Sequence, residues 1–153
     1  MTEVPLIGKL LLLQGSISLF YILSMMTLAN GMNLIDGVNG LCGAVALVIL
    51  SGLLFLSYKT ADTVMLSTIF SLMLLIAPFM FFNYPFGKIF LGDLGSYCLG
   101  MILSMLTIIL FGRHPEISPY SAALTLIYPL TEIVFTMVRR LLRGISIFRR
   151  NRY

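Results

Sequence analysis

Residues 41–58 read LCGAVALVILSGLLFLSY, a run without a charged side chain that is long enough to cross most of a bilayer. Four further stretches are nearly as apolar, and they cover residues 10–28, 63–82, 96–111 and 120–138. A spanning helix needs roughly 20 mostly apolar residues, so we expect the stretch 96–111 to borrow a turn from its flanks. The sequence predicts an all-α, polytopic membrane protein with about five transmembrane helices.

The composition disfavours an ordinary soluble domain. Of the 153 residues, 59% are hydrophobic and 10% are charged, and the mean hydropathy is +1.01. Soluble domains carry about 45–50% apolar and about 25% charged residues. A disordered chain, a nucleic-acid-binding domain and a cytosolic enzyme therefore all fit poorly. We expect the lipid bilayer as a partner and no nucleic acid, and because five spans leave only short connections, a single transmembrane domain over residues 1–153.

The connections between the spans differ in character. Loops 30–40 and 83–95 are long and rich in Gly, Asn and Asp, whereas 59–62 and 113–119 are short. Five spans place both long loops and the C-terminal tail on one side of the membrane. That side holds seven basic residues and the other side three, because six arginines fall within the tail. The positive-inside rule then predicts that both long loops and the C-terminus lie in the cytoplasm. We expect a multi-pass protein of the inner (cytoplasmic) membrane.

The first long loop, together with the start of the next span, reads NGMNLIDGVNGL over residues 30–41. Its candidate ligand-binding side chains are three amides and one carboxylate, namely Asn30, Asn33, Asn39 and Asp36. Glycines between them let backbone N–H groups approach a ligand closely. A polar helix cap followed by a turn is the alternative interpretation. Asn30, Asn33 and Asp36 recur every third residue, which on a helix would place neighbours in the series on one side.

The second long loop, with the first residue of the next span, reads NYPFGKIFLGDLGS over residues 83–96. Its lone carboxylate, Asp93, is either an N-cap for the following helix or a ligand of a hard metal ion. Mg²⁺ takes oxygen ligands, commonly one or two carboxylates plus substrate phosphates, and Asp36 and Asp93 on one membrane face could supply them. Lys88 could pair with phosphate or anchor the loop in the headgroups. Phe90 could stack on a base, although packing is the commoner role.

Four further features stand outside these loops. Glu132 lies seven residues before Arg139, about 10 Å along a helix, and a charge at that depth in the bilayer is a functional candidate unless it is protonated or hydrogen-bonded. His114 is expected to be a surface residue without a catalytic part. The tail 139–153 predicts an interfacial amphipathic helix. Both cysteines lie in apolar stretches and are expected to be buried thiols.

Three segments resemble, in order, motifs of the polyprenyl-phosphate N-acetylhexosamine-1-phosphate transferases, glycosyltransferase family 4. This family includes phospho-N-acetylmuramoyl-pentapeptide transferase and the undecaprenyl-phosphate GlcNAc-1-phosphate transferases. Residues 33–41 are similar to the family's Asn-x-x-Asp-Gly-x-x-Gly-Leu motif, and residues 88–96 to its Phe-x-Gly-Asp-x-Gly-Ser motif. Residues 129–140 resemble its late helix, which has an acidic residue and an Arg pair.

The resemblance implies a Mg²⁺-dependent enzyme of cell-wall polysaccharide biosynthesis. It would transfer an N-acetylamino-sugar-1-phosphate from a UDP-sugar to undecaprenyl phosphate and release UMP. Asp36 and Asp93 would be catalytic, with Asp93 matching the metal ligand. Substrate binding would involve Asn30, Asn33, Asn39, Lys88, Phe90 and Glu132. This interpretation leaves open whether the protein forms a homodimer.

The sequence also departs from the family pattern. The family places an Asp-Asp pair on an earlier cytoplasmic loop, a histidine-rich motif after the tail helix, and around ten or eleven spans, and many members have aspartate where this chain has Asn39. We therefore expect the C-terminal portion of a larger transferase, inactive or very weak by itself. A non-catalytic membrane subunit or the remnant of a truncated gene is the alternative. A small transporter with Glu132 as its proton or ion site is a weaker one.

Overall fold

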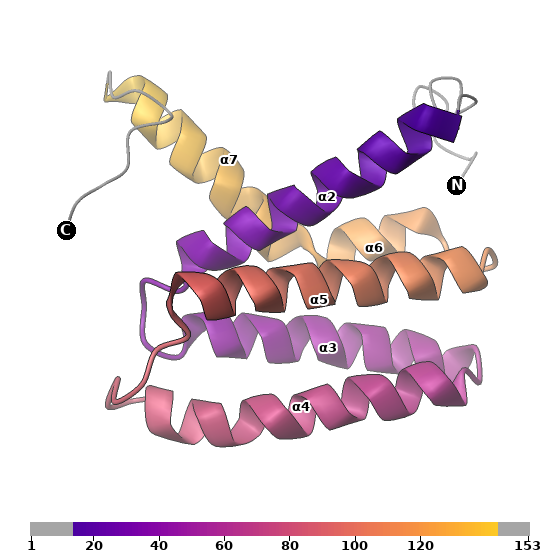
Figure 1. The fold of residues 1–153 in the computed structure, drawn as a ribbon, viewed down its shortest axis with the longest axis horizontal. Coiled ribbons are helices and arrows are strands. Elements are labelled where there is room, and N and C mark those ends of the chain that lie inside the picture. The colour runs from indigo at the N-terminus through magenta and orange to yellow at the C-terminus, as the bar shows by residue number, and fades with distance from the viewer. Residues whose placement is uncertain (1–13, 144–153) are drawn as a thin grey trace.

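Every regular element that the structure describes is a helix (Figure 1). The structure is a computed structural model, and it describes residues 14–143. In chain order the helices are α2 (Gln14–Ile35), α3 (Leu41–Lys59), α4 (Thr63–Asn83), α5 (Gly92–Arg113), the short α6 (Pro119–Thr125) and α7 (Ile127–Leu142). The all-α prediction is confirmed.

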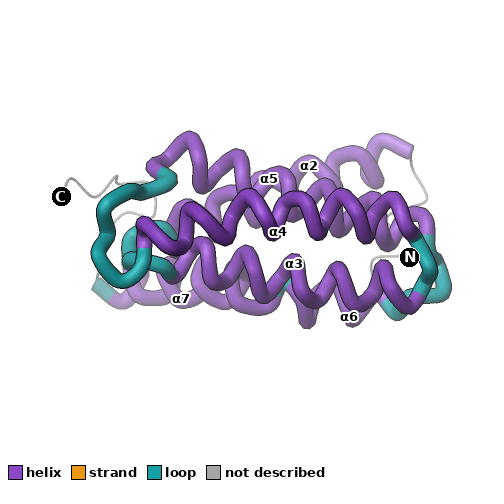
Figure 2. The backbone as a smooth tube through the Cα atoms, turned by 90° about the horizontal axis from the view of Figure 1, so that it is seen from below, coloured by secondary structure: helices purple, strands orange, loops and turns teal. Residues whose placement is uncertain are grey.

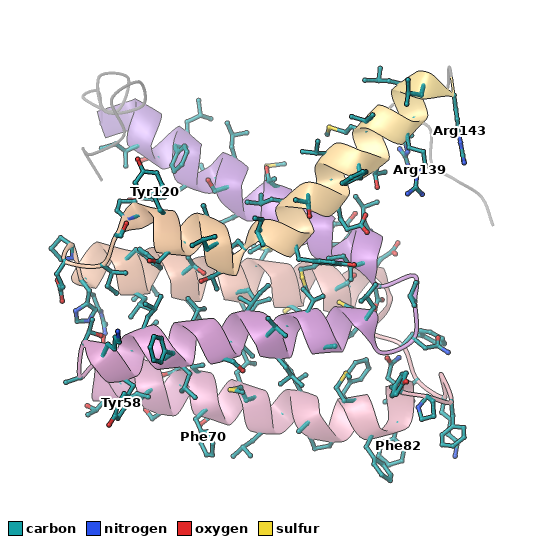
Figure 3. All side chains as sticks on the ribbon, turned by 180° about the vertical axis from the view of Figure 1, so that it is seen from behind. Tyr58, Phe70, Phe82, Tyr120, Arg139 and Arg143 are labelled. Carbon is teal, nitrogen blue, oxygen red and sulfur yellow. The ribbon has the colours of Figure 1, made fainter. Side chains whose placement is uncertain are left out.

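Four helices are long and apolar enough to cross a membrane, and the pair α6 and α7 makes a fifth candidate if it is counted as one bent span. Helices α3 and α4 begin at the expected residues, and each ends one residue later than expected. Helix α5 extends the predicted stretch 96–111 at both ends to 22 residues, about 33 Å at the rise of an α-helix. Large apolar side chains such as Phe70 and Phe82 point outward from α4, as a lipid-facing surface requires (Figure 3).

Helix α3 lies between α4 and α5, α4 runs in the opposite direction to the other two, and α2 crosses over α5 (Figure 1). The core is made of aliphatic side chains such as Leu50, Leu53 and Leu103, all fully buried. The approach of α2 to α5 depends on Gly100, because a Cβ there would lie 2.6 Å from the Cα of Ala29. The connections gather at the two ends of the bundle (Figure 2).

Two expectations about the helices need correction. The first span does not end at residue 28, because α2 continues to Ile35 and makes Asn30 and Asn33 helical. Polar side chains fit the last turns of a spanning helix when a neighbouring helix supplies hydrogen-bond partners, as α5 does for Asn33. Cys42 is buried as predicted, but Cys98 is exposed because it lies on an outward face of α5.

The predicted fifth span, 120–138, is not continuous. Helix α6 ends at Thr125, α7 begins at Ile127, and the two are bent by 63°. Pro129 explains the break, because a proline ring clashes with the carbonyl four residues earlier and contributes no N–H. Helix α7 then diverges from the bundle, and the end of α7 with Arg139 points toward the same end of the molecule as the two long loops (Figure 3). The predicted amphipathic tail helix falls largely on residues 144–153, outside the described part.

Candidate active site

The two polar loops meet at one end of the bundle. The α2–α3 connection, residues 36–40, and the α4–α5 connection, residues 84–91, lie at the same end, whereas the α3–α4 and α5–α6 connections lie at the other (Figures 1 and 2). The alternating direction of α3, α4 and α5 is responsible. Both predicted loops therefore share one end of the bundle.

Asp36 and Asp93 converge at this end. Asp36 follows the last residue of α2 and is half-buried, and its carboxylate accepts a hydrogen bond from the backbone N–H of Gly92. Gly92 begins α5 and has a positive φ of 67°. Asp93 is the next residue, and its charge acts on Asp36. Burial raises the pKa of Asp36, the Gly92 hydrogen bond opposes that increase, and the charge of Asp93 adds to it.

Asp93 is not the N-cap of α5. The helix begins at Gly92, the capping position belongs to Leu91, and Asp93 is an exposed residue within the first turn. A carboxylate there is favourable next to the helix N-terminus, which stabilises negative charge. At this position the charge of Asp93 also lies close enough to act on Asp36.

Asn33 joins the helices that carry the two carboxylates. Its side-chain oxygen accepts a hydrogen bond from the hydroxyl of Ser96 at 2.8 Å, and its amide nitrogen donates to the hydroxyl of Tyr97 at 3.1 Å. Ser96 is fully buried. Because Asn33 lies three residues before Asp36 and Ser96 three residues after Asp93, these hydrogen bonds hold the last turn of α2 against the first turn of α5.

The remaining predicted residues have less connected positions. Asn30 is exposed, and its amide nitrogen donates within its own helix to the carbonyl of Met26. Lys88 and Phe90 are exposed on the second loop, where the ammonium of Lys88 lies 5.5 Å from the ring centroid of Phe86. These residues share the loop end of the bundle with the carboxylates.

Glu132 is half-buried on α7. Its neighbours Pro129 and Ile133 lie against α2 at Gly31, where an added Cβ would be 2.9 Å from the carbonyl oxygen of Pro129. Glu132 therefore belongs to the crossing of α7 with the last turns of α2. Those turns also carry Asn33 and lead directly into Asp36.

Asn83 is a further polar residue of this region that the sequence motifs did not single out. It ends α4, is buried, and hydrogen-bonds to both long loops: its oxygen accepts from the backbone N–H of Gly40, and its nitrogen donates to the carbonyl of Ile89 at 2.6 Å. Asn39 lies beside this contact, packed against Gly87. In the sequence, Asn83 is visible only as an amide at the end of an apolar span. An asparagine that merely ends a helix would look the same.

The donor set fits a magnesium ion that is shared with substrate. Residues 14–143 contain no group of three or more His, Cys, Asp or Glu side chains able to enclose a metal by themselves. Two converging carboxylates are the usual protein contribution to Mg²⁺ when substrate phosphates and water complete an octahedral shell. Asp36 and Asp93 are a pair of carboxylates of this kind, since the charge of Asp93 acts on Asp36.

The opposite end of the bundle holds a different polar cluster. Asp62 caps α4 by accepting from the N–H of Met65 at 3.0 Å, and it pairs with His114 at 3.1 Å and Arg113 at 3.5 Å. Hydrogen bonds to Asp62 and then Glu116 raise the pKa of His114, and those from Met65 and His114 lower the pKa of Asp62. His114 thus joins the α3–α4 and α5–α6 connections, at the end of the bundle away from the carboxylate pair.

Known proteins match this chain over most of its length. The Thermotoga maritima undecaprenyl-phosphate alpha-N-acetylglucosaminyl 1-phosphate transferase is 33% identical over 122 residues, which are 80% of this chain and 36% of that protein. The Escherichia coli K12 protein of the same name is 29% identical over 78% of this chain and 34% of its own length. A Levilactobacillus brevis phospho-N-acetylmuramoyl-pentapeptide-transferase is 28% identical over 89% of this chain and 41% of its own length.

The chain therefore spans between about a third and two fifths of the length of these curated relatives. No solved structure shows a significant match. The sequence model of glycosyl transferase family 4 matches residues 2–111, a range that includes both loops and both converging carboxylates. Because that match covers more than half of the sequence, this chain belongs to glycosyl transferase family 4.

Proposed function

We propose that this chain forms part of the active site of a transferase that moves an N-acetylamino-sugar-1-phosphate from a UDP-sugar to undecaprenyl phosphate. A phosphate oxygen of undecaprenyl phosphate attacks the sugar-bearing phosphorus of the UDP-sugar. The bond from that phosphorus to the bridging oxygen breaks, and UMP leaves with this oxygen. The observation that carries the proposal is the convergence of Asp36 and Asp93 at one end of a membrane bundle.

The substrates explain why such a site belongs at a loop end of the bundle. The nucleotide sugar is soluble and the polyprenyl chain is lipid-bound, so their phosphates meet at the membrane surface. We assign this end to the cytoplasmic face of the inner membrane, together with the C-terminus, on the seven-to-three distribution of basic residues. The Arg-rich end of α7, which points the same way, would add positive charge for anionic substrates.

Asp93, with Asp36 beside it, would hold Mg²⁺. When bound, the ion would screen the two phosphates from each other and stabilise charge on the transferring phosphoryl group. Asn33 would keep the two carboxylates in register through its hydrogen bonds to α5. Lys88 would attract phosphate and Phe90 would offer a face to the base.

Three other polar residues complete the proposed substrate contacts. Asn30, Asn39 and Glu132 all belong to segments at or next to the loop end of the bundle. Glu132 lies on α7, whose exposed apolar side chains Val134 and Phe135 line a small surface pocket of about 200 Å³. A half-buried carboxylate in this position is suited to orient a polar part of a membrane-bound substrate.

The direct test places this chain in the Thermotoga maritima relative in exchange for the segment that it matches, and measures radiolabelled lipid formed from UDP-GlcNAc in membranes. We expect product with the unmodified chain and a loss of about 100-fold or more for Asp36→Asn and for Asp93→Asn. Asp62→Asn is the matched control, because Asp62 lies at the opposite end of the bundle. Equal activity in all three variants would refute the proposal.

The same assay on the chain alone separates two interpretations. A transferase segment should give little or no product alone and gain activity in the chimera. A non-catalytic subunit or gene remnant should give no activity in either context, and its phenotype should not change with Asp36→Asn or Asp93→Asn. Strong product from the chain alone would instead overturn our expectation that it needs further parts of a larger transferase.

A further inference from the structure

Asn83 differs from the other buried polar side chains of residues 14–143. The others are Ser57, Ser96, Ser104 and Thr107. The hydroxyls of Ser57, Ser104 and Thr107 donate to carbonyls one turn earlier in their own helices, which is how hydroxyls are commonly satisfied in apolar surroundings. Ser96 bonds both within its helix and to Asn33. The amide of Asn83 instead bonds outside its helix at both of its polar atoms.

The two partners of Asn83 belong to the two loops of the candidate site. Its oxygen accepts the backbone N–H of Gly40, and its nitrogen donates to the backbone carbonyl of Ile89. Gly40 follows Asp36 by four residues, and Ile89 precedes Asp93 by four residues. One buried amide thus holds both loops. It bonds each loop four residues away from the carboxylate of that loop.

The backbone around this contact is closely packed. Gly40 has a φ of 78°, and a Cβ there would lie 2.9 Å from the ring of Tyr84. Gly87 has a φ of 56°, and a Cβ there would lie 2.6 Å from the amide nitrogen of Asn39. At both places a glycine of one loop lies against a side chain of the other, so the two loops are in direct contact beside Asn83.

We propose that Asn83 is a positioning residue for the cation site: its amide joins the two loops so that Asp36 and Asp93 face the same ion. This inference rests on the proposed function, because it assigns Asn83 to the geometry of the carboxylate pair. Asn83 acts through backbone groups of both loops. Removing the Asn83 amide leaves both carboxylates in the chain but frees the two loops that position them.

The test uses the full chain in lipid nanodiscs and Mn²⁺ as a spectroscopic probe of the Mg²⁺ site, with affinity measured by electron paramagnetic resonance. Loss of a group that supports metal ligands typically costs 10–100-fold in affinity, and we expect a loss of about that size for Asn83→Ala. Asn83→Asp keeps the acceptor for Gly40 but loses the donor to Ile89. Its added negative charge favours cation binding, so a weaker affinity in this variant would have to come from lost geometry.

Ser57→Ala is the matched control, because Ser57 is also buried but its hydroxyl donates to the carbonyl of Leu53 within α3. Hydrogen–deuterium exchange on the same samples should show faster exchange in residues 36–41 and 84–92 for Asn83→Ala and no such change for Ser57→Ala. If Asn83→Ala does not fold, Asn83→Asp decides the question with the same two measurements.

Three results would overturn the proposal. Wild-type Mn²⁺ affinity in the Asn83 variants would show that the contact does not position the carboxylates. Lost affinity with unchanged loop exchange would make Asn83 a direct ligand. If the wild type binds no Mn²⁺ and loop exchange is also unchanged in Asn83→Ala, both the joining of the loops by Asn83 and the cation site are refuted. If the wild type binds no Mn²⁺ but the loops open in Asn83→Ala, the cation site of the proposed function fails and the joining of the loops is supported.

Discussion

The crossing of α2 and α5 offers a sharp test of how the bundle sets the carboxylate geometry, through the substitution Gly100→Ala. The added Cβ would lie 2.6 Å from the Cα of Ala29 and 3.0 Å from the carbonyl oxygen of Leu28. Both contacts are with backbone, so no side-chain rotation can relieve them. An ordinary van der Waals contact begins at 3.4 Å, and the two helices must therefore separate by about 0.8 Å or deform locally.

This separation reaches the candidate site along both helices. Gly100 lies seven residues after Asp93 and Ala29 lies seven residues before Asp36, so each carboxylate is about 10 Å from the crossing along its helix. Overpacking of a well-packed interior typically costs about 1–3 kcal/mol. We expect Gly100→Ala to lower stability by that amount, measured as the folded fraction that survives heating on size-exclusion chromatography in detergent, and to weaken Mn²⁺ binding.

Gly112→Ala is the control on the same helix. Nothing lies within 4 Å of a Cβ at Gly112, and alanine favours a helix over glycine by about 1 kcal/mol, so this variant should be as stable as the wild type or more stable. The reasoning fails if Gly100→Ala is at least as stable as Gly112→Ala, or if it is destabilised but binds Mn²⁺ with unchanged affinity.

Two further predictions concern the polar clusters at the ends of the bundle. Since Asp62 raises the pKa of His114, the contribution of His114 to stability should be complete below its ordinary pKa of 6.5 and be lost as pH rises through the raised value. Thermal unfolding of His114→Gln should lack this pH dependence, and a wild-type slope in that variant would contradict the assignment. Asn33→Ala loses its hydrogen bonds to Ser96 and Tyr97 and should cost about 1–3 kcal/mol, whereas Tyr97→Phe loses one and should cost about half as much in the same unfolding assay. Equal costs would show that the Ser96 bond contributes nothing.

Most of the helical framework could be predicted because hydropathy acts over whole segments. Helices α3 and α4 match the predicted stretches closely, since each is a continuous apolar run between polar turns. The break between α6 and α7 was missed even though Pro129 was visible, because a proline within an apolar run kinks one helix or separates two depending on what packs against it. Here Gly31 allows the backbone of Pro129 to approach α2.

The candidate site was only partly predictable for a related reason. Asp36 and Asp93 stood out because carboxylates are rare in this sequence and both occur among glycines. Asn83 did not stand out, since one amide at the end of a span has many uses and only its contacts with Gly40 and Ile89 distinguish it. The role of Asn33 as a link between α2 and α5 was likewise hidden, because its partners Ser96 and Tyr97 are distant in the sequence.

The amino-acid sequence alone determined that this protein is a helical bundle for a bilayer with two polar loops on one side, because transfer of apolar side chains out of water depends on composition and length rather than on neighbours. The tertiary structure decided which polar groups meet, namely Asp36 with Gly92 and Asp93, and Asn83 with both loops. Hydrogen bonds and close backbone contacts are short-ranged and directional, so they depend on helix crossings that no local pattern specifies.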